Sequence, residues 1–175
     1  MARKTLPPPK TVAQGDGYKC WAAALESWLS VTPGRLRWTQ DQLLEKRGHF
    51  TDPERKNLYP SAFNGDAINA DIFKGMLKDP ILDLKMLCKE VSVTERVEGG
   101  DIYRLLRDQG YIYIVYTVAK GGDVRHANVI YEADSEGYVN VMDPMRGALM
   151  NKAVDEFHSP VLIAYRQYTM VPGIE

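Results

Sequence analysis

The chain has 175 residues, of which 45% are hydrophobic and 26% charged, so it can form one domain with a real core and does not have the composition of a disordered chain. Its 22 basic and 23 acidic residues give a net charge of −1, which offers no electrostatic reason to expect nucleic acid or an anionic membrane as a partner. No stretch is apolar over the length that a bilayer-spanning helix needs.

The N-terminal residues 1–13 are basic and contain three consecutive prolines, but they lack the apolar region of a secretory signal. We expect them to form a proline-rich arm or linker, followed by a single domain over residues 14–175. The protein is then expected to be cytoplasmic in the producing cell. If it acts in a target cell, it would leave by a leaderless route or as part of a larger chain.

The first half of the domain is predicted to be mainly helical. A helix is expected from Cys20 to Ser30, where three alanines and a spaced set of apolar residues suit a buried helix. A second is expected from Thr39 to Lys46, with Thr39 as N-cap. An exposed loop over 48–65 should follow, then a helix from Asp66 to Leu77, and a strand within 81–94.

The second half is predicted to be rich in strands after one short helix from Asp101 to Asp108, which Gly110 should end. Turn signals at 121–122 and 134–137 separate the apolar runs. The order of helices first and an antiparallel sheet afterwards predicts an α+β domain. The expected strands are Tyr111–Ala119, Ala127–Ala133, Tyr138–Met142 and Val161–Tyr168.

The strongest local motif is Gln14-Gly-Asp-Gly-Tyr-Lys-Cys20-Trp21, a glycine-rich polar loop that leads into a cysteine at the start of a helix. The free N–H groups and the dipole of a helix N-terminus stabilise a thiolate, which is the reactive form of cysteine. The side-chain amide of Gln14 and the backbone N–H of Cys20 could form an oxyanion hole. The alternative is that Cys20 is a small buried hydrophobic residue.

The Gln-x₅-Cys-Trp pattern at Gln14, Cys20 and Trp21 resembles the active-site motif of papain-like cysteine peptidases. It looks especially like the compact bacterial members, which include secreted and effector proteases and the peptidase domains that process bacteriocin leaders. The resemblance implies a papain-like α+β fold, in which a helical part carrying the nucleophile packs on an antiparallel sheet that carries a histidine and then an aspartate or asparagine.

The sequence supplies both residues on consecutive predicted strands. His126 lies at the start of one strand and Asp143 at the end of the next, so an antiparallel hairpin would bring them together. His126 is expected to act as the base for Cys20, and Asp143 to orient the imidazole. The alternatives are a surface histidine near a turn and a turn-forming Asp-Pro pair.

Three other residues could orient the histidine: Asp123 and Asp134, which are expected to face solvent in turns, and Asn140, which falls in mid-strand. The chain also departs from larger papains. The interval between Cys20 and His126 is shorter than the roughly 130–150 residues of papain-type enzymes. Asp stands where plant papains carry Asn, and no tryptophan follows Trp38 to shield that residue.

Zinc and other cofactors are not expected. The chain has three histidines and two cysteines, which show none of the paired spacings of zinc sites. His49 and His158 are interpreted as surface residues and Cys88 as part of the core. A single disulfide remains open.

These observations predict a cofactor-free cysteine peptidase that acts on a protein or peptide substrate. Its size is compatible with a host-directed effector or an antibacterial toxin, for which a cognate inhibitor or immunity protein should exist, and equally with a housekeeping protease. Two alternatives stay open. The same Cys-His-Asp set could serve a transglutaminase, deamidase or acyltransferase, or the chain could be an inactive papain-like binding module.

Overall fold

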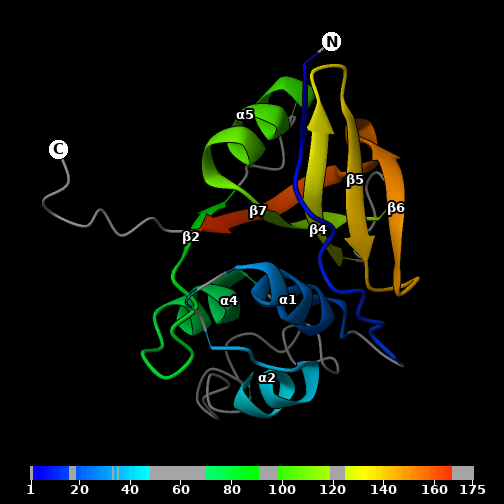
Figure 1. The fold of residues 1–175 in the computed structure, drawn as a ribbon. Coiled ribbons are helices and arrows are strands. Elements are labelled where there is room, and N and C mark those ends of the chain that lie inside the picture. The colour runs from blue at the N-terminus through cyan, green and yellow to red at the C-terminus, as the bar shows by residue number, and fades with distance from the viewer. Residues whose placement is uncertain are drawn as a thin grey trace, which may run out of the picture.

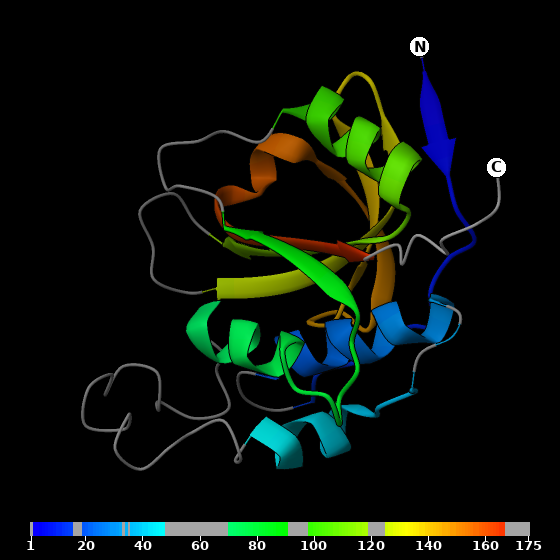
Figure 2. The same ribbon diagram turned by 90° about the vertical axis from the view of Figure 1, so that its left-hand side faces the viewer.

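The computed structural model describes residues 2–15, 19–32, 34, 36–47, 70–90, 98–118 and 125–166. Within these residues the chain forms an α+β fold in which one antiparallel sheet lies between helices (Figures 1 and 2). The loop predicted over 48–65 and the turn predicted at 121–122 lie outside the described residues.

Among the described residues, three helices lie between the first and second strands of the sheet: α1 (Cys20–Val31), α2 (Gln40–Arg47) and α4 (Ala70–Leu77). The predicted N-cap of α2 is confirmed, because the hydroxyl of Thr39 accepts a hydrogen bond from the backbone N–H of Gln42 and the Gln42 side chain accepts one from the N–H of Thr39. The predicted residues 66–69 of the third helix lie outside the described part. No helix of the described residues is both long and apolar enough to cross a membrane.

In the described residues the sheet has seven strands, and every neighbouring pair is antiparallel. Their order across the sheet is β2-β7-β3-β4-β5-β6, with β1 paired to β4. The first half of β4 pairs with β3 and its last residues pair with β1. The strands are β1 (Arg3–Thr5), β2 (Met86–Glu90), β3 (Ile112–Thr117), β4 (Arg125–Asp134), β5 (Tyr138–Asp143), β6 (Ala148–Ala153) and β7 (His158–Arg166).

Each face of the sheet carries its own hydrophobic cluster. Helices α1 and α4 cover one face, with α2 packed on the side of α1 away from the sheet, and helix α5 (Gly99–Gln109) and the short 3₁₀ helix η3 (Val154–Glu156) cover the other (Figure 2). Trp21 and Trp28 are fully buried in the first cluster, and the indole N–H of Trp28 donates to the carbonyl oxygen of Tyr111. These two tryptophans therefore pack helix α1 against the sheet.

Residues 2–13 lie against the sheet and α1 along most of their length (Figure 1). After β1, the N–H of Leu6 donates to Tyr131, and the carbonyl oxygen of Pro7 accepts from the hydroxyl of Tyr111. Further on, Lys10 forms an ion pair with Glu26 of α1. The extended arm is therefore attached to the domain. The boundary that the sequence predicts between the arm and the domain, after residue 13, stays a prediction.

Candidate active site

Helix α1 begins at Cys20, as the sequence predicts, and Cys20 is partly exposed while it packs against the first hydrophobic cluster. Lys19 is the N-cap residue, and its carbonyl oxygen accepts the N–H groups of Ala22 and Ala23. In the part of the chain that is described, no side chain caps this helix end. The positive end of the helix dipole is therefore directed at the sulfur of Cys20.

His126 is the second residue of β4, where it pairs with Tyr116 of β3. Side chains alternate between the two faces of a strand, and Ala127 and Val129 belong to the first cluster, so His126 lies on the opposite face. There the edge of its ring meets the ring of Tyr116, with centroids 5.8 Å apart. His126 is 2% exposed, so its imidazole is almost completely buried.

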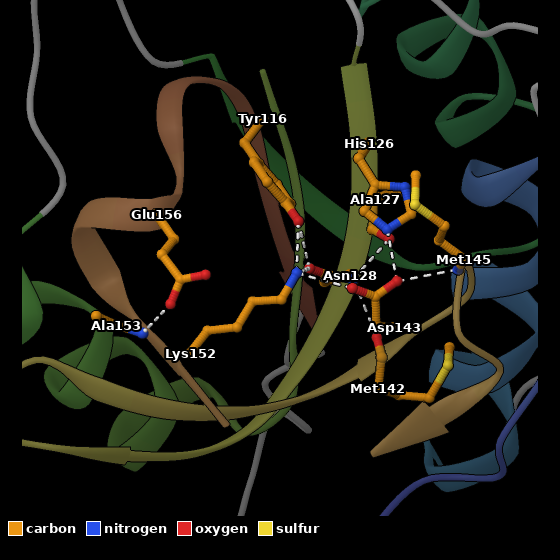
Figure 3. A network of polar contacts seen from close by, with 10 residues as sticks. All are labelled: Tyr116, His126, Ala127, Asn128, Met142, Asp143, Met145, Lys152, Ala153 and Glu156. Carbon is orange, nitrogen blue, oxygen red and sulfur yellow. Dashed lines mark hydrogen bonds and ion pairs between the residues drawn. The ribbon is translucent and has the colours of Figure 1, made fainter. Parts of the chain in front are cut away.

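Asp143 is the last residue of β5, and its carboxylate contacts the imidazole directly. The distance from Asp143 Oδ1 to His126 Nε2 is 2.7 Å (Figure 3). The same oxygen accepts a hydrogen bond from the backbone N–H of Met145, 2.9 Å away, which fixes the rotamer of the carboxylate. Met142 pairs with Val129 on β4, so the predicted hairpin is the element that brings the two residues together.

The third side chain of the predicted set, Cys20, also acts on the imidazole. Cys20 lies near His126, because its thiol is among the groups that raise the pKa of the imidazole. Because Asp143 accepts from Nε2, that nitrogen carries a proton and Nδ1 is the ring nitrogen available to Cys20. The structure thus places the three predicted residues in one chain of contacts, from sulfur to imidazole to carboxylate.

The charged forms of His126 and Asp143 stabilise each other. Burial alone lowers the pKa of His126, but hydrogen bonds with Asp143 and Cys20 outweigh it and raise the pKa to about 9. Burial also acts to raise the pKa of Asp143, yet hydrogen bonds from His126 and Lys152 overcome it and hold the pKa well below its usual range. The imidazolium and the carboxylate are therefore both ionised at neutral pH.

Three further residues, which the sequence did not indicate, surround the far side of the carboxylate (Figure 3). Lys152 of β6 lies with its ammonium 2.8 Å from Asp143 Oδ2. The same nitrogen contacts the hydroxyl of Tyr116 and the side-chain oxygen of Asn128. Asn128 lies two residues after His126, and this i, i+2 spacing was the signal that could have placed it on the same face.

Gln14, the predicted oxyanion residue, is half-buried and attached to the turn that follows Asp143. Its backbone N–H donates to the carbonyl oxygen of Pro144 at 2.9 Å. Gly15 comes next with a φ of +66°, a left-handed conformation that glycine adopts without strain. Residues 16–18 lie outside the described part, so the role of the Gln14 amide in an oxyanion hole stays a prediction.

Of the alternative residues for orienting His126, Asp134 and Asn140 make their hydrogen bonds elsewhere. Asp134 was expected to face solvent, and this is wrong: it is 6% exposed, and its carboxylate accepts the N–H groups of Glu136 and Tyr138 within the β4–β5 turn. Asn140 donates instead to Glu132. Asp123 lies outside the described residues.

The other residues considered from the sequence are His49, His158 and Cys88. His49 lies outside the described residues, and His158 begins β7. Cys88 of β2 is partly buried and packs against the first cluster, in agreement with a core role. Among the described residues no group of three or more His, Cys, Asp or Glu side chains could hold a metal ion.

Comparison with known proteins gives a likeness in structure. No protein-family model matches the chain, and no curated protein matches it in sequence. Among solved structures, it is similar to the peptidase domain of Streptococcus ComA, a bi-functional ABC transporter involved in a quorum-sensing pathway. The TM-score is 0.54 and the identity 19%, over 89% of this chain and 95% of that domain.

The likeness is one of fold. It confirms the predicted α+β, papain-like architecture, with the helical part packed on an antiparallel sheet. The resemblance to peptidase domains that the Gln14–Trp21 motif suggested is confirmed at this level.

Proposed function

We propose that the chain is a cysteine peptidase in which Cys20 is the nucleophile, His126 the general base and acid, and Asp143 the residue that orients His126. The observation that carries the proposal is the contact chain from Cys20 through the imidazole to Asp143, with a 2.7 Å bond between His126 and Asp143. A fold similar to that of a peptidase domain agrees with it.

The geometry suits hydrolysis in two steps. In the first, His126 holds the Cys20 proton on Nδ1 as an imidazolium, and the Cys20 thiolate attacks the carbonyl carbon of the scissile peptide bond. The Gln14 amide and the Cys20 N–H would stabilise the resulting oxyanion. His126 then gives its proton to the departing amine, which leaves a thioester on Cys20. In the second step, water deprotonated by His126 hydrolyses the thioester and releases the acid.

Asp143 contributes orientation and charge to both steps. Its hydrogen bond to Nε2 keeps Nδ1 directed at the sulfur, and its negative charge stabilises the imidazolium that forms when Cys20 is deprotonated. Because both partners are buried, water does not weaken the interaction. The site needs no cofactor for this chemistry.

The substrate is proposed to be a protein or peptide. If the chain is an effector or antibacterial toxin, a cognate inhibitor protein is expected to bind over Cys20 in the producing cell. The same residues could also transfer an acyl group to an acceptor other than water, as a transglutaminase or deamidase does. The test must therefore separate these products.

The test is proteome-wide labelling of new N-termini in cells that express the wild-type chain, Cys20→Ala or the control Cys88→Ala. The proposal expects new chain ends with the wild type and Cys88→Ala, and none with Cys20→Ala. A mass increase of about one dalton on glutamine side chains without new ends would instead indicate a deamidase. If neither product forms and a thiol-reactive peptide electrophile does not label Cys20, the chain is a binding module.

A further inference from the structure

The carboxylate of Asp143 is held at both of its oxygens, and by two different cations. Oδ1 contacts His126 and the N–H of Met145, whereas Oδ2 lies 2.8 Å from the ammonium of Lys152. The Lys152 side chain is 11% exposed and that of Asp143 6%, so the pair is nearly sealed from water. Such a pair is more tightly constrained than a surface salt bridge.

Lys152 is itself held in place by a polar network (Figure 3). Its three N–H groups have three acceptors: Asp143, the hydroxyl of Tyr116 at 2.9 Å and the side-chain oxygen of Asn128 at 3.2 Å. The Tyr116 hydroxyl also donates to that Asn128 oxygen. Every donor of the ammonium is therefore used, and its position is fixed.

The orientation of the Asn128 amide is set from the backbone. Its nitrogen donates to the carbonyl oxygens of Ala127 and Met142, which turns its oxygen towards Lys152. Because Met142 precedes Asp143 on β5 and Ala127 follows His126 on β4, the network joins the strands that carry the two site residues to β6. These contacts link Lys152 to both halves of the site.

We propose that Lys152 is a positioning residue that fixes Asp143 against His126, and whose positive charge sets the pH range in which the Cys20 thiolate and the His126 imidazolium coexist. This inference rests on the proposed function of the same site. Lys152 acts through Asp143 and touches no reacting atom, so replacing it should alter reactivity in a way that a loss of packing alone would not.

The direction follows from electrostatics. The groups that titrate around Lys152 are Asp143, His126 and Cys20 on one side, and Tyr116 and Glu156 on the other. Removing a positive charge makes each of them bind protons more tightly. The pH at which Cys20 becomes a thiolate and the pH at which His126 loses its proton should then both rise. A residue that only fills space would lower the rate without moving either midpoint.

The experiment measures the rate at which iodoacetamide alkylates Cys20 between pH 3 and 10, with mass spectrometry separating Cys20 from Cys88. Lys152→Met removes the charge, Lys152→Gln removes it but keeps polar contacts, and Lys152→Arg keeps it. In both neutral variants, the midpoint pH at which the alkylation rate increases should be about one unit higher than in the wild type. Lys152→Arg should stay close to the wild type. The control Lys89→Met, on the exposed side of edge strand β2, should change nothing.

A second arm asks whether Lys152 acts through Asp143. In an Asp143→Asn background, Lys152→Gln should move the midpoint by less than half of its shift in the wild type, because the group it holds has lost its charge. An equal shift in both backgrounds would overturn the positioning role. So would an unchanged profile in a folded Lys152→Gln or Lys152→Met variant, as judged by circular dichroism.

Failure of this inference can be told from failure of the proposed function. If the wild type and His126→Ala give the same alkylation profile, Cys20 is not paired with His126 and the proposed function fails first. If those two profiles differ and the Lys152 variants match the wild type, only the role of Lys152 is lost.

Discussion

The backbone N–H of Gln14 donates a hydrogen bond to the carbonyl oxygen of Pro144, 2.9 Å away. This bond attaches Gln14, which precedes helix α1, to the turn after Asp143. The same two segments meet a second time, because a Cβ built on Gly147 would stand 2.9 Å from the Cβ of Ala13. Ala13 and Gln14, which precede Cys20 in the chain, and the turn after Asp143 are thus held in one arrangement.

Gly147→Ala is expected to disturb that arrangement. Gly147 has a φ of +58°, so any side chain there costs about 1–2 kcal/mol of stability, and the added methyl group would also push Ala13 away. We expect Cys20 alkylation at pH 7 to slow about tenfold, since small displacements of reacting groups carry large rate penalties.

The control for this change is Gly34→Ala. Gly34 has a φ of +73°, but a Cβ there would meet nothing within 4 Å. It should therefore lose similar stability in thermal unfolding and keep the wild-type alkylation rate. If both variants react at the same rate, the contact between Ala13 and Gly147 does not position the loop.

The two buried aspartates of the β4–β5 hairpin are expected to have different effects when they are replaced. Replacing Asp143 should lower the reaction rate, and replacing Asp134 should lower the stability. Asp143→Ala should reduce hydrolysis of a substrate found by N-terminal labelling by about 10²- to 10⁴-fold, because the imidazole loses its orientation while the base remains. Asp134→Ala should lower the unfolding free energy by about 1 kcal/mol through loss of the turn contacts, and leave the rate within about twofold. Equal rate losses would show that the acid was wrongly assigned.

The titration of His126 should reveal its two partners. In the wild type its ring proton signals should titrate with a midpoint of about 9, measured by nuclear magnetic resonance. Cys20→Ala and Asp143→Asn should each lower the midpoint, because both partners raise the pKa of the imidazole. Cys88→Ala serves as the control and should leave it in place. A midpoint near 6.5 in the folded wild type would contradict the buried ion pair.

The same pair should make stability depend on pH. The pKa of His126 is higher in the folded chain than its unfolded value of 6.5, so its contribution is fully present below that value and is lost as pH rises through about 9. The pKa of Asp143 is lowered, so its contribution is present above its unfolded value of 3.8 and is lost as pH falls towards the folded value.

The stability difference between the wild type and Asp143→Asn should therefore be largest between about pH 4 and 6.5 and shrink on both sides. Urea unfolding at a series of pH values measures it. A difference that keeps growing with acidity would mean that the carboxylate is protonated in the folded chain.

The parts of the site that could be predicted from the sequence are those with local signals. The glycine loop and alanine-rich helix marked Cys20, and the hairpin spacing placed Asp143 beside His126. Lys152 could not be found in this way, because its strand β6 reads Ala-Leu-Met-Asn-Lys-Ala and contains no β-branched or aromatic residue. Its strand conformation comes from pairing with β5, a tertiary effect.

Burial of polar groups was the other feature that local patterns missed. The Asp-Ser-Glu-Gly turn predicted an exposed Asp134, yet its carboxylate is buried by the hydrogen bonds that close the turn. In the same way, Arg-Lys-Thr at 3–5 has no apolar pattern and becomes a strand only because β4 extends beyond β3 and offers a free edge. Both outcomes depend on neighbours that are remote in sequence.

Deletion of residues 2–5 should therefore destabilise the chain without disabling the site. It removes β1 from the last residues of β4 and the ion pair between Arg3 and the mostly buried Glu132. We expect a loss of about 1–3 kcal/mol in unfolding free energy. His126 lies at the other end of β4, which β3 holds, so Cys20 alkylation should stay within about twofold of the wild type. Arg3→Gln, which removes only the ion pair, should lose less than the deletion. A deletion variant as stable as the wild type would mean that the arm is an independent linker after all.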